Sequence, residues 1–164
     1  MNKWIKYFLI VLEVGGGFAG ISIMFIFQQW NTGTSHYFWW VFSIYVVFLF
    51  LFGIVAGLAL VEKPQLGAAL SAVYQALQIP VISSSLLTYE FFSGLQLGVG
   101  LAKGRLAFFI EYGARFALQF SMSAAPWSIG VNILALVLFV YLLLLLRPKA
   151  KVAVPSGEPI SPDN

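Results

Sequence analysis

The chain has 164 residues, of which 60% are hydrophobic and only 9% are charged, and its mean hydropathy is +0.91. A soluble domain carries charge on about a quarter of its residues, so this composition argues against one and predicts an integral membrane protein. The formal charge of +3 comes without clustered basic residues, which argues against a nucleic-acid partner, and the lack of cysteine excludes disulfides and thiol chemistry.

Three segments are long and apolar enough to cross a bilayer as helices. A helix rises about 1.5 Å per residue, so a hydrocarbon core of about 30 Å needs about 20 apolar residues. Residues 7–27, 37–61 and 127–146 each supply that length. Because Lys3 and Lys6 precede the first span, we expect the N-terminus to be cytoplasmic, in a bacterial inner membrane.

The first span contains one acidic residue, Glu13, at a depth where a carboxylate is costly. We interpret it as a group that hydrogen-bonds a neighbouring helix, at Ser43 or Asn132 for example, and fixes packing, because no second ionisable residue lies at mid-membrane. The alternative is a site that binds a proton or a cation.

Four glycines form two GxxxG motifs in the first two spans. Such motifs let helix backbones approach closely, so we interpret them as packing between these two antiparallel helices. The four residues are Gly16, Gly20, Gly53 and Gly57.

The segment after the second span has features of both a surface helix and a fourth crossing. Apolar residues recur at steps of three and four over residues 65–78, which predicts an amphipathic helix that lies on the membrane or covers a sheet. Residues 67–87 carry no charge and are long enough to cross, and a crossing there would put most Lys and Arg residues on the cytoplasmic side. Gln75, Gln78 and Pro80 would need protein partners in lipid, which favours three crossings over four.

Residues 87–120 alternate like two β-strands. Apolar residues alternate with polar residues or glycine over 87–102 and again over 105–120, and Lys103-Gly104 between them predicts a two-residue turn. With that turn, Leu97 faces Ile110 and Glu90 lies diagonal to Arg115. A slip of one residue would mix the two faces, so the pattern predicts the register.

A two-stranded ribbon of this length needs a cover for both edges. We expect the cover to come from strands of neighbouring copies, from the helix at 65–78, or from bends at glycines that fold the ribbon back. Our hypothesis is that the hairpin is an assembly element; the alternative is a small extramembrane sheet that caps the helices. The interface candidates are Glu90, Gly94, Leu97, Glu111, Gly113 and Arg115.

No chemistry-bearing cluster accompanies these elements. The serines have no adjacent base that would activate a nucleophile, so we expect no enzyme and no catalytic residue. The single histidine, His36, has no nearby Asp, Glu or Cys, so we expect no metal and no cofactor. Residues 149–164 are polar and rich in proline, which predicts a disordered tail after a single membrane domain over 1–148.

The sequence therefore predicts an integral membrane α-helical protein with three transmembrane helices, a possible fourth, an amphipathic helix and a long antiparallel β-hairpin. We expect a non-enzymatic assembly or accessory subunit of a homo-oligomer or membrane complex, with the lipid bilayer and further copies or a partner membrane protein as its partners. The alternative is a channel or transporter component whose polar path involves Glu13.

Overall fold

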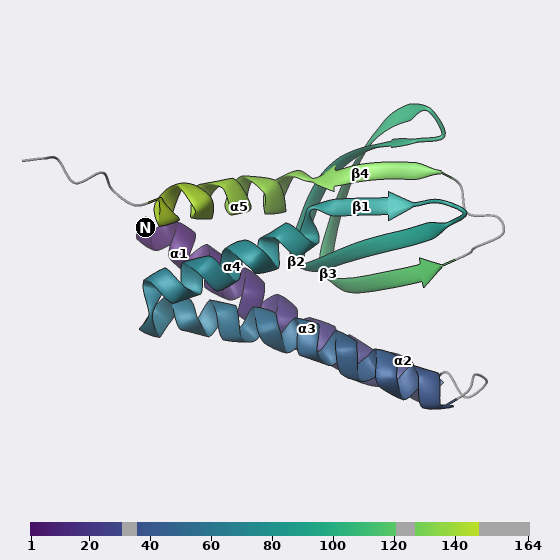
Figure 1. The fold of residues 1–164 in the computed structure, drawn as a ribbon, viewed down its shortest axis with the longest axis horizontal. Coiled ribbons are helices and arrows are strands. Elements are labelled where there is room, and N and C mark those ends of the chain that lie inside the picture. Colours follow the sequence, from purple (N-terminus) through teal and green to yellow (C-terminus); the bar gives the residue numbers. More distant parts are fainter. Residues whose placement is uncertain (31–35, 121–126, 148–164) are drawn as a thin grey trace, which may run out of the picture.

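The computed structural model describes residues 1–30, 36–120 and 127–147, without the side chains of residues 27–39. Two long helices run along the molecule; shorter helices lie beside one end of them and a sheet lies beside the other (Figure 1). The helical segments are α1 (Lys3–Ile10), the π-helical turn η1 (Val11–Gly15), α2 (Gly16–Trp30), α3 (His36–Glu62), α4 (Pro64–Gln78) and α5 (Ile133–Leu146). The strands are β1 (Pro80–Ser83), β2 (Leu87–Ala102), β3 (Arg105–Phe120) and β4 (Ser128–Asn132).

The helices form an antiparallel arrangement around two long members. α1, η1 and α2 run on as one N-terminal helix, and α3 lies antiparallel to it (Figure 1). The chain reverses at Lys63, and Pro64 occupies the first turn of α4, where its missing N–H leaves no helical bond unmade. α4 then packs between α3 and α5.

The four strands form an antiparallel sheet that curls back on itself. Residues 88–90 of β2 pair with β1, residues 98–102 pair with β4, and β1 and β4 pair with each other. The two ends of β2 therefore reach the same pair of short strands. β3 pairs with β2 along its whole length and lies at the outside of the strand order β1-β4-β2-β3.

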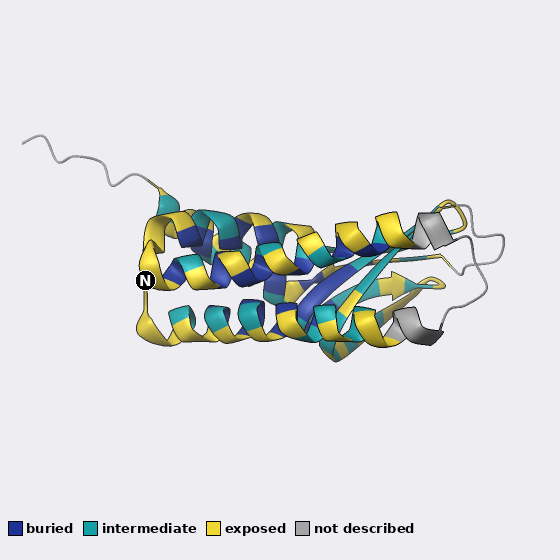
Figure 2. Ribbon diagram, turned by 90° about the horizontal axis from the view of Figure 1, so that it is seen from below, coloured by how far each residue is buried: buried dark blue, intermediate teal, exposed yellow. Residues whose placement is uncertain are grey.

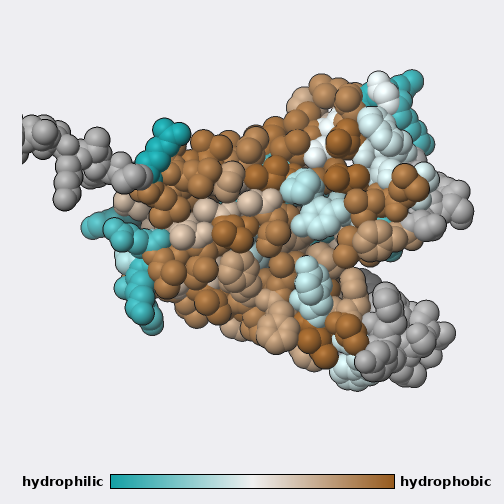
Figure 3. Space-filling view, in the orientation of Figure 1, coloured by the Kyte–Doolittle hydropathy of each residue, from teal (hydrophilic) through white to brown (hydrophobic). Residues whose placement is uncertain are grey.

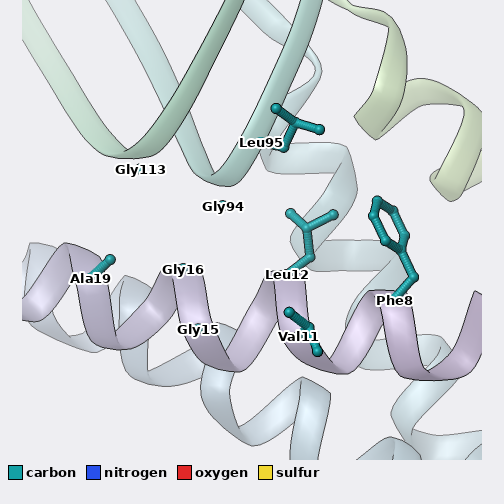
Figure 4. Close-up of a pocket in the computed structure, with 9 residues that line it drawn as sticks. All are labelled: Phe8, Val11, Leu12, Gly15, Gly16, Ala19, Gly94, Leu95 and Gly113. Atoms are coloured by element: carbon teal, nitrogen blue, oxygen red, sulfur yellow. The ribbon is translucent and has the colours of Figure 1, made fainter.

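Two glycines bend the β2–β3 ribbon. Gly94 and Gly113 lie opposite each other in the ladder and have φ angles of 91° and 116°. Side chains rarely adopt such angles, and glycine does so without steric cost. Both strands turn sharply at these residues, beside the N-terminal helix (Figure 4). Of the covers expected from the sequence, the glycine bend is thus present.

The core lies where the sheet meets the helices. Phe91 of β2 is buried against Phe50 of α3 and Tyr74 of α4, with ring centroids 5.6 and 5.5 Å apart. A second cluster, which includes Leu9, Leu60 and Leu142, joins α1, α3 and α5. Figure 2 shows the buried residues on the helix sides that face one another.

The predicted fold class is wrong. Among the described residues, only Lys3–Ile26 and Trp40–Glu62 are long and apolar enough to cross a bilayer as helices. Residues 127–146 divide into strand β4 and the 14-residue helix α5, because Asn132 caps that helix by accepting a hydrogen bond from the Ala135 N–H at 3.3 Å. With two candidate spans and a four-stranded sheet, this is not a three- or four-helix integral membrane protein.

The possible fourth crossing at 67–87 is also absent from the described structure. α4 ends at Gln78 and β1 begins at Pro80. Proline has no N–H for the helical ladder and disfavours helical geometry in the residue before it, so a helix cannot continue here without a kink. β1 instead takes its hydrogen-bond partners from β2 and β4.

The hairpin has the strand limits and the pairing that the sequence pattern predicts. Residues pair from Ala102↔Arg105 at the turn to Leu87↔Phe120 at the base. Lys103 and Gly104 have φ angles of 51° and 75°, the positive values of a type I′ turn. The predicted tail, residues 149–164, lies outside the described residues.

We predict opposite outcomes for alanine at two neighbouring glycines. A Cβ atom on Gly16 would lie 2.3 Å from Ser93 Oγ and 2.4 Å from Gly94 N, whereas one on Gly15 would meet nothing within 4 Å. Gly16→Ala should therefore lower the free energy of unfolding by about 1–3 kcal/mol, as overpacking does. Gly15→Ala should leave it unchanged or raise it by up to about 1 kcal/mol, since alanine is the better helix former. Thermal unfolding followed by circular dichroism in one detergent measures both; equal shifts would contradict the close contact.

Candidate functional site

Glu13 joins the N-terminal helix to α4 inside the molecule. Its side chain is 0% exposed and accepts hydrogen bonds from Ser71 Oγ at 2.8 Å and Gln75 Nε2 at 3.1 Å. Ser71 and Gln75 are four residues apart, so one face of α4 presents both. Both ion pairs found among the described residues involve Arg115, and neither involves Glu13. The arrangement is a hydrogen-bonded link between two helices.

The sequence-based interpretation of Glu13 named the wrong neighbours. Ser43 and Asn132 were expected as partners, but Asn132 instead caps α5 and the partners of Glu13 come from α4. The available signal was the set of polar residues on one side of α4. A buried acid in the first helix is the group that such polar residues would pair with.

Buried polar side chains continue from Glu13 into the sheet. Gln78 lies one turn beyond Gln75, and its Oε1 accepts the Ser93 backbone N–H at 2.9 Å. Asn132 lies opposite Gly98 in the ladder, and Gln96 lies two residues further along β2 on the same face. The amide nitrogens of Gln78, Gln96 and Asn132 are buried and have no hydrogen-bond partner among the described residues. The interior of this molecule is therefore unusually polar where α4 meets the sheet.

α4 has its polar face inside and its apolar face outside. Leu66 and Val73 are 50% and 54% exposed, whereas Ser71, Gln75 and Gln78 are buried. A surface helix of a soluble protein has the opposite arrangement. Polar residues that face the protein and apolar residues that face outward are typical of a helix in contact with lipid.

The charged side chains lie mainly at the two ends of the molecule. Lys3, Glu62, Lys63 and Arg147 lie at helix termini on the side where the N-terminus is marked, and Lys103 and Arg105 lie at the hairpin turn (Figure 1). Between these ends the visible surface is mostly hydrophobic (Figure 3).

The four GxxxG glycines lie at three different contacts. Cβ atoms on Gly20 and Gly57 would meet Phe50 and Val14, so these two lie at the contact between the N-terminal helix and α3. Gly53 faces the ring of Tyr74 in α4, and Gly16 faces the ribbon bend. The structure thus places two of the four at the helix pair for which they were predicted.

Three of the hairpin candidates form an ion-pair group beside the bend. Arg115 Nε lies 3.3 Å from Glu90 Oε2, and Arg115 Nη1 lies 3.7 Å from Glu111 Oε2. Burial raises the pKa of Glu90 above its ordinary value; Arg115 opposes this rise and Glu111 adds to it. Gly94 and Gly113 form the bend itself, and Leu97 pairs with Ile110 beyond it.

Beyond the bend the ribbon presents a row of large apolar side chains to the outside. Before the bend, Phe91 and Phe116 pack on the helices; beyond it, the corresponding face points away from them. We call this surface the outer sheet face. Phe108 and Ile110 are each 75% exposed and Tyr112 is 91% exposed. Its exposed residues are Leu101, Leu106, Phe108, Ile110, Tyr112, Ile129 and Val131.

An open groove of about 300 Å³ lies between the N-terminal helix and the ribbon bend. Apolar side chains and glycines line it, including Phe8, Leu12 and Leu95 (Figure 4). It offers no charged or hydrogen-bonding side chain to a ligand, so it suits contact with apolar chains only.

Comparison with protein families, with curated proteins and with solved structures finds no match for this chain.

We predict that Glu13→Ala is strongly destabilising. It would leave Ser71 and Gln75 buried without their acceptor, at a cost of about 1–3 kcal/mol for each orphaned group. Glu13→Gln should cost less, since its amide oxygen can still accept one of the two bonds. Thermal unfolding compares both with Glu62→Ala, an exposed acid at the end of α3. A Glu13→Ala effect no larger than that of Glu62→Ala would contradict the proposed link.

We predict that the effect of Arg115→Ala on stability depends on pH. Arg115 lowers the pKa of Glu90, so its removal lets the folded-state pKa rise further. An acid with a raised folded-state pKa destabilises the fold above that pKa, and the penalty disappears as pH falls through it. The variant should lose about 1 kcal/mol at neutral pH and much less at about pH 4. Denaturant unfolding at both pH values measures this, and Lys3→Ala, an exposed control, should show no such difference.

Proposed function

We propose that this protein is a non-enzymatic assembly subunit that works at a lipid bilayer, where its hairpin joins it to another protein chain. The outer sheet face is the observation that carries the proposal. Phe108, Ile110 and Tyr112 project from strand β3 with at least three quarters of their surface exposed. Large apolar side chains gathered on one face of a sheet mark a surface that another molecule covers.

The distribution of polar groups supports the bilayer part of the proposal. Charged residues lie mainly at the ends, α4 turns its apolar face outward, and the long helices expose apolar side chains such as Phe18 and Phe48. Only 33% and 39% of the residues in the apolar windows of the two long helices are buried, whereas a core helix would be mostly buried. A lipid environment accounts for all three features.

Backbone chemistry supports the assembly part. In a bilayer each unsatisfied N–H or C=O group costs several kcal/mol, so an open sheet edge cannot face lipid. Among the described strands, β3 has a partner on one side only. Protein must therefore cover its other side if the sheet lies at membrane depth. This favours the assembly hypothesis over a sheet that only caps the helices.

The geometry around Glu13 gives the channel alternative no added support. Glu13 faces α4 of its own chain, where Ser71 and Gln75 use its two oxygens. That arrangement suits helix packing, and the polar path between copies stays a prediction from the sequence.

We predict that the chain associates with liposomes and is oligomeric in mild detergent, because the free edge of β3 needs a protein partner and the apolar outer sheet face lies beside it. Replacing Phe108 and Ile110 together with asparagine should reduce the oligomer to a monomer, since both side chains lie at that face. Phe18→Asn with Phe25→Asn, equally drastic changes on α2, should leave the oligomer intact. Liposome flotation and light scattering measure the two properties. A stable monomer that stays in the aqueous fraction, or an unchanged oligomer in the Phe108 and Ile110 variant, would contradict the proposal.

A further inference from the structure

The outer edge of β3 has a definite set of free backbone groups. Lys103 donates its backbone N–H to Trp127 O at 3.3 Å, on the β4 side of β2. The backbone N–H and C=O groups of successive residues in a strand point alternately to its two sides. Those of residues 98, 100 and 102 of β2 therefore point toward β3, and those of their partners 109, 107 and 105 point toward β2. The alternate residues of β3, from 106 to 112, therefore direct their backbone N–H and C=O groups away from β2. These are Leu106, Phe108, Ile110 and Tyr112.

The same four residues carry the apolar side chains of the outer sheet face. A second copy of the chain could pair with this edge in antiparallel fashion about a two-fold axis. In such a pair, the residue numbers of two directly opposite residues always add up to the same value, and this value defines the register. If the value is even, the apolar residues of one copy lie opposite the apolar residues of the other. If it is odd, they lie opposite residues whose side chains belong to the other face of the sheet.

Among the registers with an even sum and an axis at residues 106–110, charge favours one. Arg105 has no ion pair within the described chain, and Glu111 contacts only Arg115, at 3.7 Å. With the axis at Phe108, Arg105 lies directly opposite the partner's Glu111, and the two-fold makes this pair twice. Opposite charges on directly facing residues stabilise a sheet, whereas like charges destabilise it. A shift of the axis by one residue in either direction would remove the direct pair and leave Arg105 only diagonal to the partner's Glu111. The shift toward residue 109 would also put Arg105 diagonal to the partner's Arg115.

We propose that two copies of this chain join through their β3 edges, antiparallel and centred on Phe108. Leu106 then pairs with the partner's Ile110, and Phe108 pairs with the partner's Phe108, all in hydrogen-bonded positions. The inference rests on the proposed function, because it names the chain that the hairpin joins. It fits a second copy because one self-complementary contact pairs residues 105–111 of both free edges at once.

Single cysteines test this register, since the chain has no cysteine of its own. Phe108→Cys alone should form a disulfide-linked dimer in liposomes, because Cα atoms in a hydrogen-bonded pair lie about 5.5 Å apart. Leu106→Cys alone and Ile110→Cys alone should not, since each residue lies about 13 Å from its own copy at about 3.3 Å per residue. A mixture of these two variants should link again. The substituted positions are exposed, so folding should survive.

A charge exchange gives a second, independent measurement. Arg105→Glu alone and Glu111→Arg alone should each weaken dimer association about tenfold, because like charges then face each other. The variant with both changes should recover wild-type association. Crosslinks in other combinations, self-linking at Leu106 or Ile110, or no rescue by the double change, with the oligomer still present, would overturn this register and leave the proposed function standing. A chain that is monomeric in liposomes would overturn both.

Discussion

The fold depends on one close contact, where Gly16 of the N-terminal helix meets the ribbon bend at Gly94. A Cβ atom on Gly16 would lie 2.4 Å from Gly94 N, so any other residue would push the two backbones apart. Because Gly94 and its partner Gly113 both hold positive φ angles, the ribbon can turn at this point. That turn lets one half of β2 reach β1 and the other half reach β4, and it directs the outer sheet face away from the helices.

Polar groups hold the interior together around this contact. Glu13 ties the N-terminal helix to α4 through Ser71 and Gln75, and Gln78 ties α4 to the ribbon through the Ser93 N–H. In lipid, helices gain little from burying apolar side chains, because the surroundings are equally apolar. Hydrogen bonds and close glycine contacts then decide how helices pack. The inverted polarity of α4 is therefore consistent with the proposed bilayer setting.

The sequence predicts local structure well here and long-range structure poorly. The limits and register of β2 and β3 follow from a pattern of period two around Lys103-Gly104, because a hairpin fixes its own pairing. The prediction of one helix over residues 127–146 was wrong, because hydropathy does not distinguish an apolar strand from an apolar helix. Ile129 and Val131 are equally apolar in either, and their pairing with β2 is what makes them a strand. The link from Glu13 to α4 joins residues about 60 positions apart, which no local pattern indicates.

The curled sheet also limits the edges through which chains can associate. β1 and β4 each have partners on both sides, and β2 has partners on its second side at both ends, with residues 91–97 around the bend left without one. Among the described strands, β3 therefore offers the one long free edge. A sheet with two free edges can add chains without limit, which is the usual hazard of exposed strands. A two-fold contact centred on Phe108 pairs residues 105–111 of β3 in both chains at once, so this segment of the edge cannot bind a third chain. The bend at Gly94 and Gly113 thus has a consequence for assembly, because it lets β1 and β4 pair with the other side of β2 at both its ends.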